Sequence, residues 1–184
     1  MQGKIRIIGG KWRGRKLPVP ISPGLRPTPD RVKETLFNWL TPYIEGANCL
    51  DLFAGTGALG FEALSRGAGH VVMVEQNRAL ADQIQFQSDI LSAKELEIIC
   101  ADVSSWLSHC KQKFDIVFID PPYASAQAGN ITQQLLNCDC LKPGALIYME
   151  SDRKVTDIAP ALQAIKQSKA GVVEFQLLKY IQDT

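Results

Sequence analysis

The 184-residue sequence has no long apolar run, no Cys-x-x-Cys pair and only two histidines. None of its apolar stretches approaches the roughly 18 consecutive residues that a membrane-spanning helix needs. The basic N-terminus lacks the apolar segment of a secretory signal peptide, so we expect a cytoplasmic protein with no membrane contact. The length is typical of one main domain with a small appendage.

The cysteines and histidines form no pattern typical of a metal site. Cys49 and Cys100 fall in apolar, strand-like runs, where a reduced cysteine acts as a small hydrophobe. Cys138-Asp-Cys140 is a close pair, but no second cluster would complete the four ligands of a structural metal. His70 and His109 each lack a partner in a catalytic spacing. We therefore expect no metal and no disulfide.

Acidic residues are nearly absent from the first 33 positions. This segment carries nine Lys/Arg residues against one acid, Asp30, so its net charge is +8 and the rest of the chain totals −7. Such an asymmetry indicates that one end of the chain meets a polyanion. Residues 4–19 are predicted to form a β-hairpin, with Gly9-Gly10 and Gly14 at turn positions. We assign residues 1–27 to a basic arm and residues 28–184 to the main domain.

The arm has the side chains of a nucleic-acid contact, because cations bind phosphates and an aromatic ring stacks on a base. The candidate RNA-binding residues are Lys11, Trp12, Arg13, Arg15, Lys16 and Arg26. The alternative is a solvated hairpin whose Trp12 packs on the body of the protein. Composition favours neither interpretation.

From Asn48 onward, strand-like and helix-like patterns alternate. The expected strands are residues 49–53, 71–75, 97–100, 114–120, 145–150 and 172–180, the last of them antiparallel near the sheet edge. The expected helices are residues 59–66, 78–91, 105–110 and 131–136, after a first helix with Thr28 as N-cap, Pro29 as its first residue and its end at Pro42. Residues 155–169 fit either a helix or a helix followed by a strand. Regular alternation predicts an α/β, doubly wound sheet with helices on both faces.

The segment Asp51-Leu-Phe-Ala-Gly-Thr-Gly57 is expected where the first buried strand ends. Ligands of open α/β sheets bind beyond the carboxyl ends of the strands. Gly55 and Gly57 allow a tight turn and a close approach of ligand to backbone, and Gly60 allows the next helix to pack closely on the strand. Gly55 to Gly60 also matches Gly-x-Gly-x-x-Gly, a weak signal by itself for a dinucleotide.

Acids at the ends of three successive strands favour S-adenosylmethionine over a dinucleotide. Asp51 would repel a pyrophosphate but can hold the cationic methionyl end of the cofactor. Glu75 can accept hydrogen bonds from both ribose hydroxyls. Asp102 can accept from the adenine amino group, with the backbone of Val103 facing the ring edge. Phe53, within the turn, completes the candidate cofactor set.

The segment Asp120-Pro-Pro-Tyr123 is expected at the same edge, after the fourth strand. An amide or nucleobase amine is a poor nucleophile because its lone pair is delocalised. The Asp120 carboxylate and the Pro121 carbonyl can accept its two N–H protons, while Tyr123 offers a face for stacking. These three residues are the candidate catalytic set. Glu150, which ends the next strand, is a further candidate for this edge.

Together these segments resemble the class I S-adenosylmethionine-dependent amino-methyltransferases. The string Arg6-Ile-Ile-Gly-Gly-Lys-Trp-Arg-Gly14, with Leu25–Thr28 and Arg31–Asn38, is similar to the bacterial family that methylates the exocyclic N2 of a guanine in small-subunit ribosomal RNA. The resemblance implies a Rossmann-like, mostly parallel seven-stranded sheet with an antiparallel strand near its end. It also implies an RNA-contacting hairpin and a substrate that is an assembled or assembling small subunit.

Three alternatives remain open. The same fold can methylate adenine N6 or a glutamine amide, and those relatives often carry Asn where Asp120 stands; the basic arm argues against a protein substrate. A dinucleotide-dependent oxidoreductase is suggested by Gly55 to Gly60, but Asp51 and Asp120-Pro-Pro-Tyr123 argue against it. An RNA-binding module with a vestigial cofactor site would bind without turnover.

Overall fold

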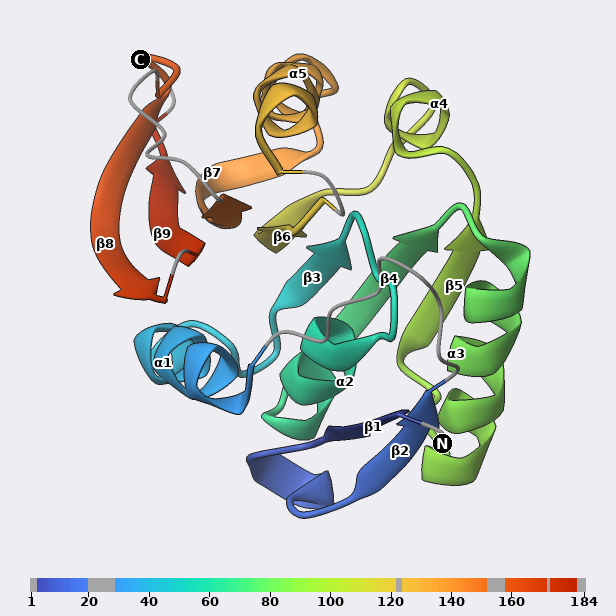
Figure 1. Cartoon of the computed structure of the whole chain (residues 1–184). Coiled ribbons are helices and arrows are strands. Elements are labelled where there is room, and N and C mark those ends of the chain that lie inside the picture. The colour runs from blue at the N-terminus through green and yellow to red at the C-terminus, as the bar shows by residue number, and fades with distance from the viewer. Residues whose placement is uncertain (1–2, 20–28, 122–123, 152–157, 172, 182–184) are drawn as a thin grey trace.

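The apolar strand segments form one seven-stranded sheet in the computed structural model, which describes residues 3–19, 29–121, 124–151, 158–171 and 173–181 (Figure 1). The strand order is β5-β4-β3-β6-β7-β9-β8. The strands are β3 (Asn48–Asp51), β4 (His70–Glu75), β5 (Leu96–Cys100), β6 (Phe114–Ile119), β7 (Leu141–Ser151), β8 (Leu162–Ala170) and β9 (Val173–Tyr180). β3 to β7 pair in parallel, and β9 lies antiparallel between β7 and β8. The predicted fold class is confirmed.

Helices cover both faces of the sheet, as Figure 1 shows. They are α1 (Asp30–Leu40), α2 (Ala58–Ser65), α3 (Arg78–Leu91), α4 (Val103–Leu107) and α5 (Ala124–Asn137). Successive strand residues point to opposite faces, so neighbours such as Cys49 and Leu50 join different core clusters. The first cluster packs under α1, α2 and α3, and the second under α4 and α5. A parallel sheet buried on both faces explains the nearly continuous apolar strands.

The structure corrects two sequence predictions and decides one that the sequence left open. α1 begins at Asp30, one residue later than predicted, and its N-cap is Pro29. The Pro29 carbonyl accepts hydrogen bonds from the N–H groups of Val32 and Lys33. The predicted N-cap, Thr28, lies outside the described residues. The ambiguous segment contains strand β8, which forms because its backbone pairs with β9. Cys138 and Cys140, whose Cα atoms lie 5.4 Å apart, are joined as a disulfide, although the sequence predicted none.

Gly60 lies in α2, where the helix crosses β4. A Cβ atom at this position would overlap the Met73 side chain of β4. The predicted close packing of this helix on the sheet is therefore confirmed, although the strand concerned is β4.

The N-terminal hairpin packs on the same core as α1, α2 and α3. Its strands β1 (Gly3–Arg6) and β2 (Lys16–Val19) pair antiparallel, and a short 3₁₀ turn at Gly10–Trp12 lies in the loop between them. Ile5 and Leu17 are buried in the first core cluster. In the described parts of the chain, no helix is long and apolar enough to cross a membrane.

Candidate functional site

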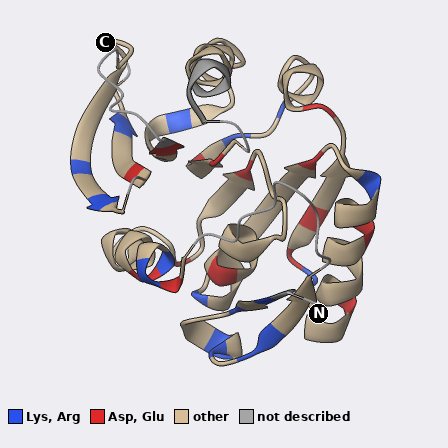
Figure 2. Cartoon of the chain, viewed as in Figure 1, with Lys and Arg blue, Asp and Glu red and all other residues tan. Residues whose placement is uncertain are grey.

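The acids predicted for the site follow adjacent strands at one edge of the sheet. Asp51, the last residue of β3, stands opposite Met73 of β4 and Phe118 of β6. Glu75, the last residue of β4, stands opposite Cys100, which ends β5. Figure 2 shows acidic residues at the tips of the β3 and β4 arrows. Because the strands are parallel and end in register, the segments that follow them meet at this edge. We call this edge, formed by Asp51, Glu75 and the residues that follow β3 to β7, the acidic rim.

The turn after β3 has the conformation that its glycines permit. Gly55 and Gly57 have φ angles of 53° and 76°, in the left-handed region that favours glycine. The buried Glu75 carboxylate holds this turn, because one of its oxygens accepts from the Gly55 N–H at 2.7 Å. The other oxygen accepts from the Asn77 N–H at 2.8 Å. Each carboxylate oxygen can accept a further hydrogen bond, so the acceptor role predicted for Glu75 remains compatible with its structural role.

Asp51 is the most perturbed acid of the rim. Its side chain is 1% exposed, and its Oδ1 has no hydrogen-bond partner among the described residues. Burial raises the pKa of Asp51 from 3.8 to about 7, although hydrogen bonds from the Gly60 and Phe53 backbone oppose the shift and the charge of Glu75 adds to it. A buried carboxylate with an unpaired oxygen is costly unless a donor or a cation reaches it. The site therefore fits a positively charged ligand group.

Two further cofactor candidates lie beside the turn after β5. Asp102 is exposed and is the N-cap of α4, because its Oδ1 accepts from the Ser105 N–H at 2.9 Å. Val103 is buried, whereas Phe53 is half-buried and packs on the second core cluster. Sequence reasoning did not anticipate the capping role of Asp102, although Asp is among the preferred N-cap residues.

Asp120 and Pro121 follow β6 at the acidic rim. Asp120 is half-buried and Pro121 is buried, while Tyr123 lies outside the described residues. On the neighbouring strand β7, the Tyr148 hydroxyl donates to Glu150 Oε2 at 2.7 Å. Burial raises the pKa of Tyr148 well above its usual value, and the charges of Glu150 and Asp120 add to the shift. Glu150 thus lies at the rim, and Tyr148 is a member that sequence reasoning missed because it reads as an ordinary core aromatic.

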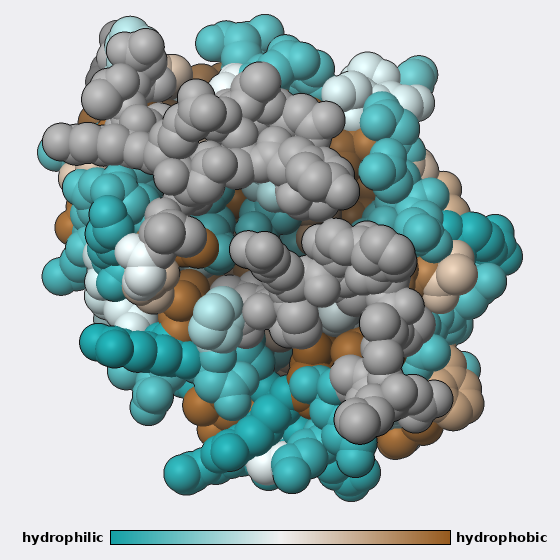
Figure 3. Space-filling view, in the orientation of Figure 1, coloured by the Kyte–Doolittle hydropathy of each residue, from teal (hydrophilic) through white to brown (hydrophobic). Residues whose placement is uncertain are grey.

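The candidate RNA-binding residues are mostly exposed on the hairpin. Lys11, Arg13, Arg15 and Lys16 are exposed, and Figure 2 shows basic residues along the hairpin. Figure 3 shows a predominantly hydrophilic surface over this loop, at the bottom of the view. Trp12 is half-buried and packs against the first core cluster, as the alternative interpretation supposed, with Lys11 Nζ 4.4 Å from its ring centroid. Arg26 lies outside the described residues.

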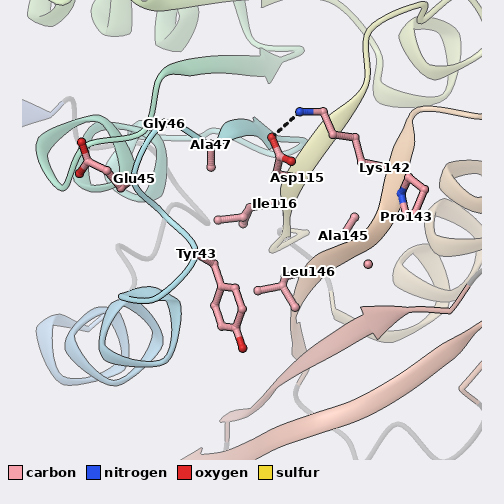
Figure 4. A pocket seen from close by; sticks show the side chains of 11 residues that line it. Tyr43, Glu45, Gly46, Ala47, Asp115, Ile116, Lys142, Pro143, Ala145 and Leu146 are labelled. Atoms are coloured by element: carbon pink, nitrogen blue, oxygen red, sulfur yellow. Dashed lines mark hydrogen bonds and ion pairs between the residues drawn. The ribbon is translucent and has the colours of Figure 1, made fainter.

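A pocket of about 320 Å³ lies at the opposite edge of the sheet, where β3, β6 and β7 begin (Figure 4). It is lined by Tyr43, Glu45 and an ion pair in which Lys142 Nζ lies 2.7 Å from Asp115 Oδ2. None of its lining residues is a predicted site residue. Among the described residues there is also no group of three or more His, Cys, Asp or Glu side chains arranged to hold a metal.

Comparisons with known proteins identify the family of this chain. A family model described as "Conserved hypothetical protein 95" matches residues 5–179. The chain is 45% identical over 181 residues to the ribosomal RNA small subunit methyltransferase D of Haemophilus influenzae, covering 96% of this chain and 94% of that protein. It is 46% identical over 177 residues to the Escherichia coli protein of the same name, covering 95% and 89%. The solved structure of a putative methyltransferase, yhhF, from Escherichia coli has a TM-score of 0.90 and 38% identity, and the match covers 98% of this chain and 100% of that one.

The doubly wound sheet, with one antiparallel strand beside its edge strand, is a Rossmann-like fold, and the similar proteins place the chain in the class of methyltransferases with this fold. Within that class, the chain belongs to the family of the ribosomal RNA small subunit methyltransferase D. These relatives are named methyltransferases, which gives the oxidoreductase alternative no support.

Proposed function

We propose that this protein transfers a methyl group from S-adenosylmethionine to the exocyclic N2 amine of a guanine in small-subunit ribosomal RNA. The observation that carries the proposal is the pairing of β3 with β6. It brings the buried Asp51, whose Oδ1 has no partner in the part of the chain that the structure describes, next to the strand that leads to Asp120 and Pro121. A site for a cationic cofactor group and a site for an amine thus lie on neighbouring strands.

The residues of the turn fit the cofactor. Asp51 Oδ1 is the acceptor for its cationic methionyl end, and Gly55 and Gly57 leave room for its approach. Glu75 keeps the turn in place through the Gly55 N–H and accepts from the ribose hydroxyls with its remaining capacity. Asp102 and Val103 line the adenine. When bound, S-adenosylmethionine supplies a methyl carbon made electrophilic by the positively charged sulfur.

Asp120 and Pro121 orient the target nitrogen. Their carboxylate and carbonyl oxygens accept the two N–H protons of the amine, which directs its lone pair toward the methyl carbon. Pro121 is buried, its φ is fixed by its ring and its ψ is restricted by the proline that follows in the sequence, so its carbonyl is oriented before substrate binds. Tyr123 provides the face on which the guanine stacks. Placement and electrostatics then account for most of the acceleration.

The hairpin supports an RNA substrate. Its exposed cations, together with Arg26, are suited to phosphates near the target, and residues 1–27 act as the RNA-contacting arm. The guanine must leave its stack to reach Asp120, and phosphate contacts offset part of that cost. The two relatives are named for small-subunit ribosomal RNA, which supports an RNA of that kind as the substrate. The RNA would be presented within an assembled or assembling small subunit in the cytoplasm.

The test is methyl transfer with labelled S-adenosylmethionine. The acceptors are small subunits from cells that lack this enzyme, naked ribosomal RNA, DNA and protein, and the products are digested and identified. We expect label in N2-methylguanosine from the subunits. Label in N6-methyladenine or glutamine would overturn the substrate but keep the reaction class. Cofactor binding without transfer to any acceptor would favour the RNA-binding module.

A further inference from the structure

The loop of the basic hairpin is attached to the last turn of α2 by a buried carboxylate. Glu62 is 0% exposed, and its Oε2 accepts from the Ile8 N–H at 2.8 Å. Its Oε1 accepts from the Gly9 N–H at 2.8 Å and from Arg66 Nε at 2.7 Å. A buried carboxylate is tolerated only when it is fully paired. Two of the three donors to Glu62 come from the hairpin, so the stability of this charge depends on the loop being in place.

Neighbouring residues strengthen the attachment. Ser65 Oγ accepts from the Trp12 N–H at 3.0 Å and donates to the Gly9 carbonyl at 2.5 Å. On α1, Lys33 is 2% exposed and donates to the Arg6 carbonyl at 2.6 Å. These bonds end on hairpin backbone atoms, so they fix the course of the chain and leave the basic side chains exposed.

Gly10 allows the backbones of loop and helix to approach closely. Its φ is 74°, and a Cβ atom there would overlap the Ser65 carbonyl group. Gly14, in the same loop, has a φ of 84°, but a Cβ atom there would meet nothing within 4 Å. Gly10 is therefore needed for contact with α2, whereas Gly14 is needed only for backbone conformation.

The same helix connects this loop to the acidic rim. The cofactor turn, with Gly55 and Gly57, leads directly into the first turn of α2, and Glu62 and Ser65 lie in its last turns. Eight helical residues span about 12 Å, at about 1.5 Å per residue. The loop is thus held at a fixed distance from the cofactor turn. Fixing a binding loop before association reduces the ordering cost of binding.

We propose that Glu62 is a positioning residue for RNA: it never touches the substrate, but it holds the cationic loop in the orientation that RNA binding requires. The inference rests on the proposed function, because it takes the hairpin to be the RNA contact. α2 then has two roles: its first turn follows the cofactor turn, and its last turn holds the basic loop.

The first test is Glu62→Gln, with methyl-transfer kinetics on the small-subunit substrate. Glutamine keeps the shape, but Ile8 and Gly9 donate to different carboxylate oxygens, and the NH2 group that replaces one of them is a donor that would face an N–H donor. We expect KM for the RNA substrate to rise about ten-fold, equivalent to about 1.4 kcal/mol. kcat at saturating substrate and Kd for S-adenosylmethionine should stay within about two-fold. Amide hydrogen exchange should accelerate at Ile8 and Gly9. A merely structural role would lower the active fraction, and hence kcat, without raising KM.

The second test changes the hairpin side of the contact and leaves the buried residues of α2 intact, so it stands even if Glu62→Gln does not fold. Gly10→Ala displaces the loop from Ser65, and Gly14→Ala is the matched control with comparable backbone strain and no clash. We expect Gly10→Ala to raise KM for RNA about ten-fold and Gly14→Ala to raise it much less. Equal effects of the two alanines would overturn the role of the contact with α2.

A third variant separates the inference from the proposed function. The hairpin-charge variant, Arg13→Ala/Arg15→Ala/Lys16→Ala, removes cations without touching Glu62. If it raises KM for RNA while Glu62→Gln and Gly10→Ala do not, the positioning role is wrong and the RNA contact stands. If it leaves KM unchanged, the hairpin is not the RNA contact, and the inference fails with that part of the proposed function.

Discussion

Replacing Asp51 by Asn should make the cofactor-free protein more stable at neutral pH. Burial raises the pKa of Asp51 from 3.8 to about 7, so the folded protein holds this proton more tightly than the unfolded chain. Stability therefore falls as pH rises from about 4 to about 7, as the unfolded chain releases the proton first. At about 1.36 kcal/mol per pKa unit, the full effect is about 4 kcal/mol.

The sign and the pH window make this prediction specific. Below pH 4, Asp51 is protonated in both states, so the Asp51→Asn variant and the natural protein should differ little from this cause. At pH 8 the variant should be more stable by up to about 4 kcal/mol. The gain is reduced because the asparagine NH2 group, at the position of Oδ1, is buried with no acceptor among the described residues. Urea unfolding of both proteins at pH 4, 6 and 8, without cofactor, measures the difference. The reasoning would be refuted if the difference in unfolding free energy between the two proteins did not change with pH. It would also be refuted if the advantage of the variant were smaller at pH 8 than at pH 4.

Cofactor binding should show the opposite preference. A cationic group binds the ionised form of Asp51, so below pH 7 the Kd for S-adenosylmethionine should rise about ten-fold per pH unit. Asp51→Asn should bind weakly, with this pH dependence removed. Calorimetric titration between pH 5.5 and 8.5 measures both. A Kd that is constant over this range in the natural protein would remove Asp51 from the cofactor site.

Three other changes test the remaining parts of the site. Asp120→Ala should lower kcat at least about 100-fold, because the target amine loses an acceptor, and Kd for the cofactor should not change. Near-normal turnover in the labelled transfer assay would exclude Asp120 from the mechanism. Glu75→Gln should weaken cofactor binding about ten-fold or more in calorimetry, because its NH2 group would face the N–H of either Gly55 or Asn77, which now donate to the two carboxylate oxygens. Unaltered affinity would contradict this role. The hairpin-charge variant should reduce the slope of log K for RNA binding against log salt concentration by about 2, because each of three lost phosphate contacts on a single strand contributes about 0.7. Filter binding at several salt concentrations measures this slope. An unchanged slope would exclude these cations from phosphate contact.

Local patterns determined most of the fold. The alternation of apolar strands and amphipathic helices predicted the doubly wound sheet, and helix α3 matches its predicted bounds because Asn77 is an N-cap and its apolar residues recur at helical spacing. The sequence also predicted that the glycine turn and the acids at the strand ends lie together, because residues that follow parallel strands meet at one edge of the sheet. The sequence left open whether residues 155–169 include a strand, because the residues of β8 gain strand structure only by pairing with β9.

The tertiary structure decided what depends on residues far apart in the sequence. Glu62 reads as an ordinary helical acid, and its partner Ile8 is 54 positions away, so no local pattern reveals that it holds the hairpin. The raised pKa of Asp51 arises from burial, which no short segment specifies. The sequence by itself determined the elements, the turn and the chemical types at the acidic rim. Their burial, and the attachment of the basic loop to α2, follow only when the helices pack on the sheet.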